Sequence, residues 1–135
     1  LFDPIREKAD EGFPIFGTCA GLILLAKEVM DGPDTLGLLN ISVERNAYGR
    51  QIESFESELE FATNGDNVDG AGKFTGVFIR APQIDRVGSD VEVLARHEGL
   101  PVLVRKDNLL GATFHPELTE NYKIHRFFLN EMIGN

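Results

Sequence analysis

The order of apolar and polar positions in the N-terminal part of the chain predicts a helix, a strand and a second helix. Asp3 and Pro4 resemble a helix cap followed by proline at the first helical position, so a helix is expected over residues 4–11. The apolar residues 13–18 predict a short buried strand. The apolar run after it predicts a helix over 20–30, up to a Gly-Pro breaker. This alternation of strand and helix is typical of an α/β layer.

Strand patterns dominate the rest of the chain. Residues 50–61 alternate in their second half, which places Phe55, Leu59 and Phe61 on one face and acidic side chains on a solvated face. The glycine- and asparagine-rich stretch 63–73 predicts a flexible loop. Apolar residues at helical spacing predict a C-terminal amphipathic helix over 119–133, with its apolar face in the core. Further strands are predicted at 38–44, 74–80, 91–96, 101–105 and 109–114.

Composition and charge narrow the class of protein. With 135 residues the chain is long enough for one domain with a sizeable core, and 42% hydrophobic residues are ordinary for a soluble protein. The formal net charge of −9 argues against nucleic acid as a partner, because phosphate binding needs clustered lysine and arginine. There is no apolar run of membrane-spanning length and no signal peptide. Because the single cysteine also fits a reducing compartment, we expect a cytoplasmic protein without a membrane partner.

The start of the chain departs from the usual α/β order. No strand is predicted before the helix at 4–11, although a parallel α/β domain normally begins with one. We therefore expect residues 1–135 to form a single domain that is N-terminally incomplete.

The only cysteine, Cys19, lies in the sequence Gly-Thr-Cys-Ala-Gly at 17–21, between the predicted strand and the second predicted helix. Glycines on both sides of a nucleophile allow the sharp strand-to-helix turn of a nucleophile elbow. The N–H groups and the positive dipole end of the following helix would favour the thiolate, which is the nucleophilic form. The alternative is that Cys19 is a small buried hydrophobic residue, and the turn alone leaves both interpretations open.

His115 and Glu117 are the candidates for activating that thiol. They follow the predicted strand 109–114 directly, and the end of a strand places side chains at the rim of the sheet, where α/β sites form. In an extended link, residues two apart point to the same side, so the carboxylate can orient the imidazole. The imidazole can then take the thiol proton and later protonate a leaving amine. Taken alone, His115 also fits a capping or core role.

The remaining motifs add no second kind of chemistry. His97 stands beside a predicted hairpin turn and His125 on the predicted C-terminal helix, and both are expected to be solvated. No cysteine–histidine cluster has metal-ligand spacing, so no metal site is expected. The chain has neither a P-loop nor Gly-x-Gly-x-x-Gly, so nucleotide binding has no support and no cofactor is expected.

The motifs around Cys19 and His115 resemble those of the triad glutamine amidotransferases. The interior narrows the resemblance, because residues 43–51 read Val-Glu-Arg-Asn-Ala-Tyr-Gly-Arg-Gln and residues 54–56 read Ser-Phe-Glu. Phe-Ile-Arg-Ala-Pro stands at 78–82. Together with residues 109–118, these stretches closely resemble the glutaminase subunit of pyridoxal 5′-phosphate synthase, and the resemblance runs over nearly the whole chain.

The resemblance implies a fold and a partner. The fold is α/β, with a three-layer, mostly parallel central sheet, helices on both faces and an antiparallel or mixed extension. The partner is a synthase subunit, a (β/α)₈ barrel that uses ammonia from the glutaminase to build pyridoxal phosphate from ribose 5-phosphate and glyceraldehyde 3-phosphate. The two subunits are expected to form a large hetero-oligomer.

The resemblance also assigns roles to residues in the hydrolysis of L-glutamine to L-glutamate and ammonia. Cys19 would attack the side-chain amide, His115 would act as base and then as acid, and Glu117 would orient it. The backbone N–H of Ala20 would be one oxyanion donor. A guanidinium can hold the α-carboxylate of a free amino acid bidentately, although an arginine taken alone also fits an ordinary surface charge. The positions that match glutamine contacts in the family are Arg45, Ile79 and Arg80.

One part of the family pattern is absent from the sequence. Family members carry an upstream strand and a Gly-Gly-Glu-Ser loop that helps bind glutamine and supplies the other oxyanion donor. The polypeptide 1–135 alone is therefore expected to have little or no glutaminase activity.

Three alternatives to this function stay open. The first is a glutaminase that serves another synthase, such as imidazole glycerol phosphate synthase, and residues 43–56 argue against it. The second is a catalytically silent interaction module of the same fold, against which the intact Cys19, His115 and Glu117 argue. The third is a cysteine peptidase or deglycase of similar α/β form, which would act without a synthase and ignore glutamine.

Overall fold

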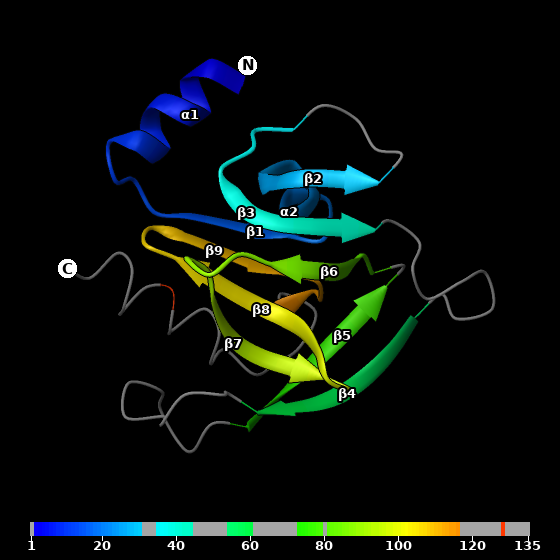
Figure 1. The fold of residues 1–135 in the computed structure, drawn as a ribbon. Helices are drawn as coiled ribbons and strands as arrows, with labels where there is room; N and C mark the ends of the chain where they lie inside the picture. The colour runs from blue at the N-terminus through cyan, green and yellow to red at the C-terminus, as the bar shows by residue number, and fades with distance from the viewer. Residues whose placement is uncertain are drawn as a thin grey trace.

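A four-stranded mixed sheet lies at the centre of the fold (Figure 1). Its strand order is β1-β9-β8-β7, and β1 (Ile15–Thr18) pairs parallel with β9 (Leu109–Ala112). β8 (Leu100–Lys106) is antiparallel both to β9 and to β7 (Glu92–His97). The computed structural model describes residues 2–30, 35–44, 54–60, 73–79, 81–116 and 128.

Further elements cover both faces of the central sheet (Figure 1). On one face lies an antiparallel hairpin of β4 (Ser54–Glu60) and β5 (Lys73–Ile79). On the other face lie the short helix α2 (Ala20–Leu25) and a three-stranded sheet in the order β2-β3-β6. The strands of this second sheet are β2 (Ala26–Met30), β3 (Leu39–Glu44) and β6 (Gln83–Val87), with β2 parallel and β6 antiparallel to β3.

The strand β9 is buried on both of its faces. Leu110 and Ala112 belong to the hydrophobic cluster under the β4–β5 hairpin, whereas Leu109 belongs to the cluster around α2 and β3. Successive side chains of a strand point to opposite faces, so a strand covered on both sides needs an unbroken apolar run. The two hydrophobic clusters therefore lie back to back across the central sheet.

Glycines allow α2 to lie directly on the central sheet. A Cβ atom added at Gly17 of β1 would lie 2.7 Å from the backbone oxygen of Gly21 in α2. One added at Gly111 of β9 would lie 2.5 Å from Cδ1 of Leu22. Both separations are too short for real atoms. At Gly17 the obstacle is backbone, so only glycine lets the helix approach this closely, whereas at Gly111 the obstacle is the end of the Leu22 side chain. The close approach brings the first turn of α2 to the end of β1.

The N-terminal helix α1 (Phe2–Asp10) is attached to this core by polar and apolar contacts. Ile5 and Ala9 pack against the cluster around α2. Asn108 Nδ2, in the turn before β9, donates hydrogen bonds to the carbonyls of Ala9 and Phe13, at 3.1 and 2.7 Å. Neither helix in the described part of the chain is long and apolar enough to cross a membrane.

Most elements predicted from the sequence are present. The predicted helix 4–11 and the predicted strand 50–61 are confirmed within a few residues, with Phe55 and Leu59 facing inward and the glutamates of β4 exposed. Phe128 packs against the core, with its ring 5.3 Å from that of Phe16, as expected for the C-terminal apolar face. The other confirmed strands are those predicted at 13–18, 38–44, 74–80, 91–96, 101–105 and 109–114. Residues 63–72 of the predicted loop 63–73, Phe61 and the rest of the predicted helix 119–133 lie outside the described residues.

The helix predicted over 20–30 is wrong beyond Leu25. Ala26 adopts an extended conformation, with φ −63° and ψ 146°, and β2 follows it. Val29 pairs with Val43 in the parallel β2–β3 ladder. An apolar run does not by itself distinguish a buried helix from a buried strand, so pairing with β3 decides the outcome here. The short strand β6 was also not predicted, because polar residues and the flanking Pro82 obscure its pattern.

The α/β class is confirmed, with mixed sheets. Of the six strand pairs in the described residues, β1–β9 and β2–β3 are parallel and the other four are antiparallel. The described residues therefore do not establish the three-layer, mostly parallel sheet that the resemblance implied.

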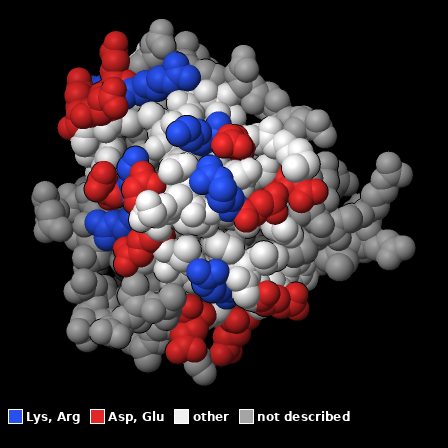
Figure 2. Space-filling view, viewed as in Figure 1, with Lys and Arg blue, Asp and Glu red and all other residues white. Residues whose placement is uncertain are grey.

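Charged side chains of both signs are interspersed on the face shown in Figure 2. Lys106 Nζ lies 2.9 Å from the Asp90 carboxylate, and Asn40 Nδ2 donates to the same carboxylate over 3.1 Å. Hydrogen bonding from Lys106, and then from Asn40, holds the pKa of Asp90 below its ordinary value. Arg86 donates to Asn40 Oδ1 over 3.2 Å, so this exposed network joins β8, β3 and β6.

The variant Gly17→Ala tests the close approach of α2 to the sheet. The new Cβ meets backbone atoms of Gly21, which move only if α2 moves, so we expect the free energy of unfolding to fall by about 1–3 kcal/mol. Urea denaturation measures this. Gly21→Ala is the matched control, since nothing lies within 4 Å of a Cβ at that position. Equal stability of the two variants would contradict the packing described here.

Candidate active site

Cys19 occupies a sharp, strained turn between β1 and α2. Its backbone angles are φ 50° and ψ −105°, a conformation that residues with a side chain rarely adopt. The helix begins at the next residue, Ala20. The turn therefore has the strand–turn–helix form of a nucleophile elbow, in which backbone strain presents a side chain at the edge of the sheet.

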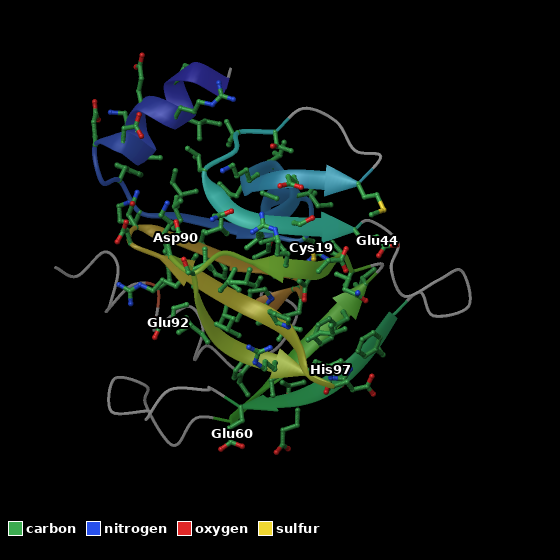
Figure 3. All side chains as sticks on the ribbon, viewed as in Figure 1. Cys19, Glu44, Glu60, Asp90, Glu92 and His97 are labelled. Carbon is green, nitrogen blue, oxygen red and sulfur yellow. The ribbon has the colours of Figure 1, made fainter. Side chains whose placement is uncertain are left out.

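Hydrogen bonds tie Cys19 to the strand beside it. Thr18 lies opposite Ala112 in the parallel β1–β9 register, so Cys19 and Thr113 leave the sheet at the same edge (Figure 3 labels Cys19). The N–H of Cys19 donates to the Ala112 carbonyl over 2.9 Å. Its thiol donates to the Thr113 carbonyl over 3.2 Å. The half-buried sulfur thus has a polar contact, unlike a cysteine that only fills space in the core.

His115 follows Thr113 by two residues and is half-buried. Its N–H donates to the carbonyl of Val77 in β5 over 2.7 Å, which joins the segment after β9 to the β4–β5 hairpin. Phe114, between Thr113 and His115, is fully buried, with its ring 5.7 Å from that of Phe78. The fold therefore brings the segments that carry a thiol and an imidazole, far apart in the sequence, to one edge of the central sheet.

Ile79 and Ala20 are the other predicted site residues that the structure describes. Ile79 ends β5, two residues beyond Val77, and is 40% exposed. Ala20 is the first residue of α2, so its N–H belongs to the first turn, where N–H groups have no partner within the helix. The predicted site residues that lie outside the described residues are Arg45, Arg80 and Glu117.

The expectation that His97 is solvated is wrong. Its Nδ1 lies 3.0 Å from Ser57 Oγ, and its ring lies 5.3 Å from that of Phe55 and 5.5 Å from that of Phe78. The β4–β5 hairpin covers the end of β7 and half-buries the ring, which a local turn pattern does not reveal. His97 therefore packs beneath the hairpin. In Figure 3 it lies well apart from Cys19.

Within the ranges that the structure describes, no group of three or more histidine, cysteine, aspartate or glutamate side chains is placed to hold a metal ion. His125 lies outside those ranges.

Thr113 is a site residue that the motifs do not indicate. It is 1% exposed, and its carbonyl accepts the Cys19 thiol. The available signal was a threonine just before Phe-His-Pro-Glu, but threonine is common in strands. Its contact with Cys19 arises only from the pairing of β1 with β9.

The fold and the strained cysteine turn agree with comparisons to known proteins. Residues 1–134 of the chain match the SNO glutamine amidotransferase family. The chain belongs to this family, which confirms the class inferred from the motifs.

The chain is also similar to individual proteins of known name. The chain is 53% identical over 132 residues to the pyridoxal 5′-phosphate synthase subunit PdxT of Thermosipho africanus, covering 96% of this chain and 66% of the relative. It is 54% identical over 135 residues to PdxT of Thermus thermophilus, covering 98% of this chain and 66% of that protein. The chain thus spans about two thirds of the length of these curated relatives.

Solved structures agree with the same class. A crystal structure of a glutamine amidotransferase superposes with a TM-score of 0.87 at 52% identity, covering 99% of this chain and 68% of that one. A glutamine amidotransferase from Thermotoga maritima has a TM-score of 0.63 at 17% identity, covering 98% of this chain and 52% of that one. The second likeness shows the fold alone.

The variant His115→Asn tests whether the imidazole acts on the thiol. Cys19 is the only cysteine, so the rate of iodoacetamide alkylation reports on this one sulfur. We expect the variant to be alkylated about tenfold more slowly at neutral pH, because asparagine cannot take the proton from the thiol and the thiolate fraction therefore falls. His97→Gln is the control, since this histidine packs beneath the hairpin, and it should react at the unmodified rate. Equal alkylation rates for the unmodified protein and the two variants would show that His115 does not act on the Cys19 thiol.

Proposed function

We propose that this chain is the glutaminase subunit of a pyridoxal 5′-phosphate synthase and hydrolyses L-glutamine to L-glutamate and ammonia. The observation that carries the proposal is the thiol of Cys19, presented in a strained turn and bonded to Thr113, two residues before His115. Membership of the SNO family and the likeness to two PdxT proteins support the same activity.

The proposed reaction has two steps at the Cys19 sulfur. In the first, His115 takes the thiol proton and the sulfur attacks the amide carbon of glutamine. The imidazolium then gives its proton to the leaving nitrogen, which departs as ammonia and leaves a glutamyl thioester. In the second step His115 removes a proton from water, the resulting attack releases glutamate, and the proton returns to the sulfur. Glu117 holds the imidazole in the tautomer and orientation that both steps need.

The negative oxygen formed in each step needs hydrogen-bond donors. The N–H of Ala20 stands directly after the nucleophile and at the start of α2, which fits the role of one oxyanion donor. Such a donor typically lowers the barrier by about 3 kcal/mol. The dipole contribution of α2 is confined to its first turn, so the helix can act on Cys19 although it ends at Leu25.

We further propose that Arg45, Ile79 and Arg80 bind glutamine, as the resemblance to the family implies. Ile79 is partly exposed at the end of β5, on the strand whose Val77 carbonyl binds the backbone of His115, which supports a place beside the substrate. A guanidinium from Arg45 or Arg80 would pair bidentately with the α-carboxylate of glutamine.

The proposed partner is the synthase subunit, a (β/α)₈ barrel that receives the ammonia within a large hetero-oligomer in the cytoplasm. The names of the PdxT relatives support a synthase partner, because they describe those proteins as synthase subunits. We further propose that the whole domain has a three-layer, mostly parallel sheet, of which residues 1–135 form an N-terminally incomplete part. The greater length of the relatives supports this view.

The experiment that tests the function is glutamate release from glutamine, assayed with and without the synthase subunit and on chains with and without the N-terminal extension that the family resemblance implies. We expect release to be highest with the synthase subunit and the extension both present, and slight from residues 1–135 alone. The Cys19→Ala variant should release no glutamate, because it lacks the nucleophile. It should still bind the synthase subunit, because the substitution removes little volume.

Each alternative function predicts a different result in that assay. A catalytically silent module would bind the synthase and release no glutamate in any mixture. A glutaminase of another synthase would respond to imidazole glycerol phosphate synthase instead. Loss of binding in Cys19→Ala would show that the cysteine is structural.

A further inference from the structure

The guanidinium of Arg6 joins α1 to the segment that leads into β3. Arg6 is half-buried, and it donates from Nε to the carbonyl of Leu36 and from Nη2 to the carbonyl of Thr35, each over 3.1 Å. In Figure 1 this segment lies between α1 and α2. Because the guanidinium is planar, two hydrogen bonds from it to successive carbonyls fix both the position and the orientation of the segment.

The same segment binds the carboxyl end of α2. The N–H of Leu36 donates to the carbonyl of Leu24 over 2.8 Å, and the hydroxyl of Thr35 donates to the carbonyl of Ala26 over 2.6 Å. The last carbonyls of a helix have no partner within the helix, so such hydrogen bonds come from other parts of the chain. Arg6 and α2 therefore bind the same two residues, 35 and 36, and the position of one depends on the other.

The helix α2 is short, so its two ends move together. It has only six residues, and a helix of this length depends on the surrounding structure for its stability. At its amino end the carbonyl of Cys19 accepts the N–H of Ile23 over 3.1 Å. The strained backbone angles of Cys19 persist only where the surroundings enforce them. A shift of the carboxyl end of α2 therefore moves the turn that carries the sulfur.

We propose that Arg6 is a positioning residue for the nucleophile, and that it acts through Thr35, Leu36 and α2 on the turn at Cys19. The inference rests on the proposed function, because the rate of attack on glutamine depends on where α2 places the sulfur. A misplacement of a reacting atom by about 1 Å can slow a reaction about a hundredfold, so a hydrogen bond far from the substrate can influence the rate. Arg6 itself takes no part in the chemistry.

The variant Arg6→Met removes the two hydrogen bonds and keeps an apolar side chain of similar reach. Asn108→Ala is the matched control, because it also removes two hydrogen bonds that attach α1 to the core. Those bonds run from Asn108 Nδ2 to the carbonyls of Ala9 and Phe13, so they connect α1 with the turn before β9. Both variants loosen α1, but only the first loosens the segment that binds α2.

A second pair of variants tests the link between the segment and α2. Thr35→Val keeps the shape of the side chain and removes the hydrogen bond to Ala26, whereas Thr35→Ser keeps the hydroxyl that makes it. This pair loses one hydrogen bond at most, so it decides the question if Arg6→Met does not fold.

Three measurements are made on the whole protein. The first is the rate of iodoacetamide alkylation at Cys19, which needs neither glutamine nor the synthase subunit. The second is kcat and KM for glutamine in the complex with the synthase subunit. The third is the thermal unfolding midpoint, and both rates are measured well below it.

We expect Arg6→Met and Thr35→Val to lower kcat about tenfold, with KM unchanged, because the sulfur is misplaced while the binding of glutamine is retained. Alkylation should be about threefold slower in both, since the sulfur lies less favourably for the imidazole that takes its proton. Thr35→Ser should keep both rates. Asn108→Ala should keep both rates as well, although its thermal midpoint falls as much as that of Arg6→Met.

The inference is overturned if a folded Arg6→Met or Thr35→Val variant keeps the unmodified alkylation rate. It is also overturned if Asn108→Ala lowers both rates as much as Arg6→Met, because a general loss of stability would then explain the effect. The proposed function fails separately, if the unmodified complex releases no glutamate. In that case the alkylation rates still show whether Arg6 acts on the turn at Cys19.

Discussion

The parallel pairing of β1 with β9 is the constraint on which the candidate active site depends. Its register runs from Ile15 opposite Leu109 to Thr18 opposite Ala112, so the next residue of each strand leaves the sheet at one edge. A shift by one residue would turn each side chain of β9 to the opposite face. Because Leu109 and Leu110 fill separate hydrophobic clusters on the two faces, the register is determined by core packing on both sides of the sheet.

The same packing holds the strained turn in place. The close approach of α2 to β1 and β9 buries Leu22 and Leu25, while the backbone of Cys19 is bonded to Ala112. These interactions offset the unfavourable angles at Cys19, and strain of this kind persists only where the surroundings enforce it. The sulfur is thereby presented at the edge of the sheet and bonded to a backbone carbonyl, although an apolar helix begins at the next residue.

The sequence correctly predicted the structural features that depend on interactions between neighbouring residues. Gly17 and Gly21 around Cys19 indicated a sharp turn, and the inward and outward faces of β4 followed from simple alternation. The features that the sequence did not predict depend on pairing between distant segments. The second half of the apolar run becomes β2 because it pairs with β3, and His97 is covered because the β4–β5 hairpin lies over it. The contact of Thr113 with the thiol likewise follows from the β1–β9 register.

The central claim is that the sulfur of Cys19 is a nucleophile served by His115. The most direct measurement exposes the whole protein, with its synthase subunit, to a glutamine analogue that carries an electrophile in place of the side-chain amide. Peptide mass spectrometry then locates the adduct. We expect one adduct, on Cys19, that excess glutamine suppresses. An unmodified Cys19, or labelling that glutamine does not affect, would contradict the central claim.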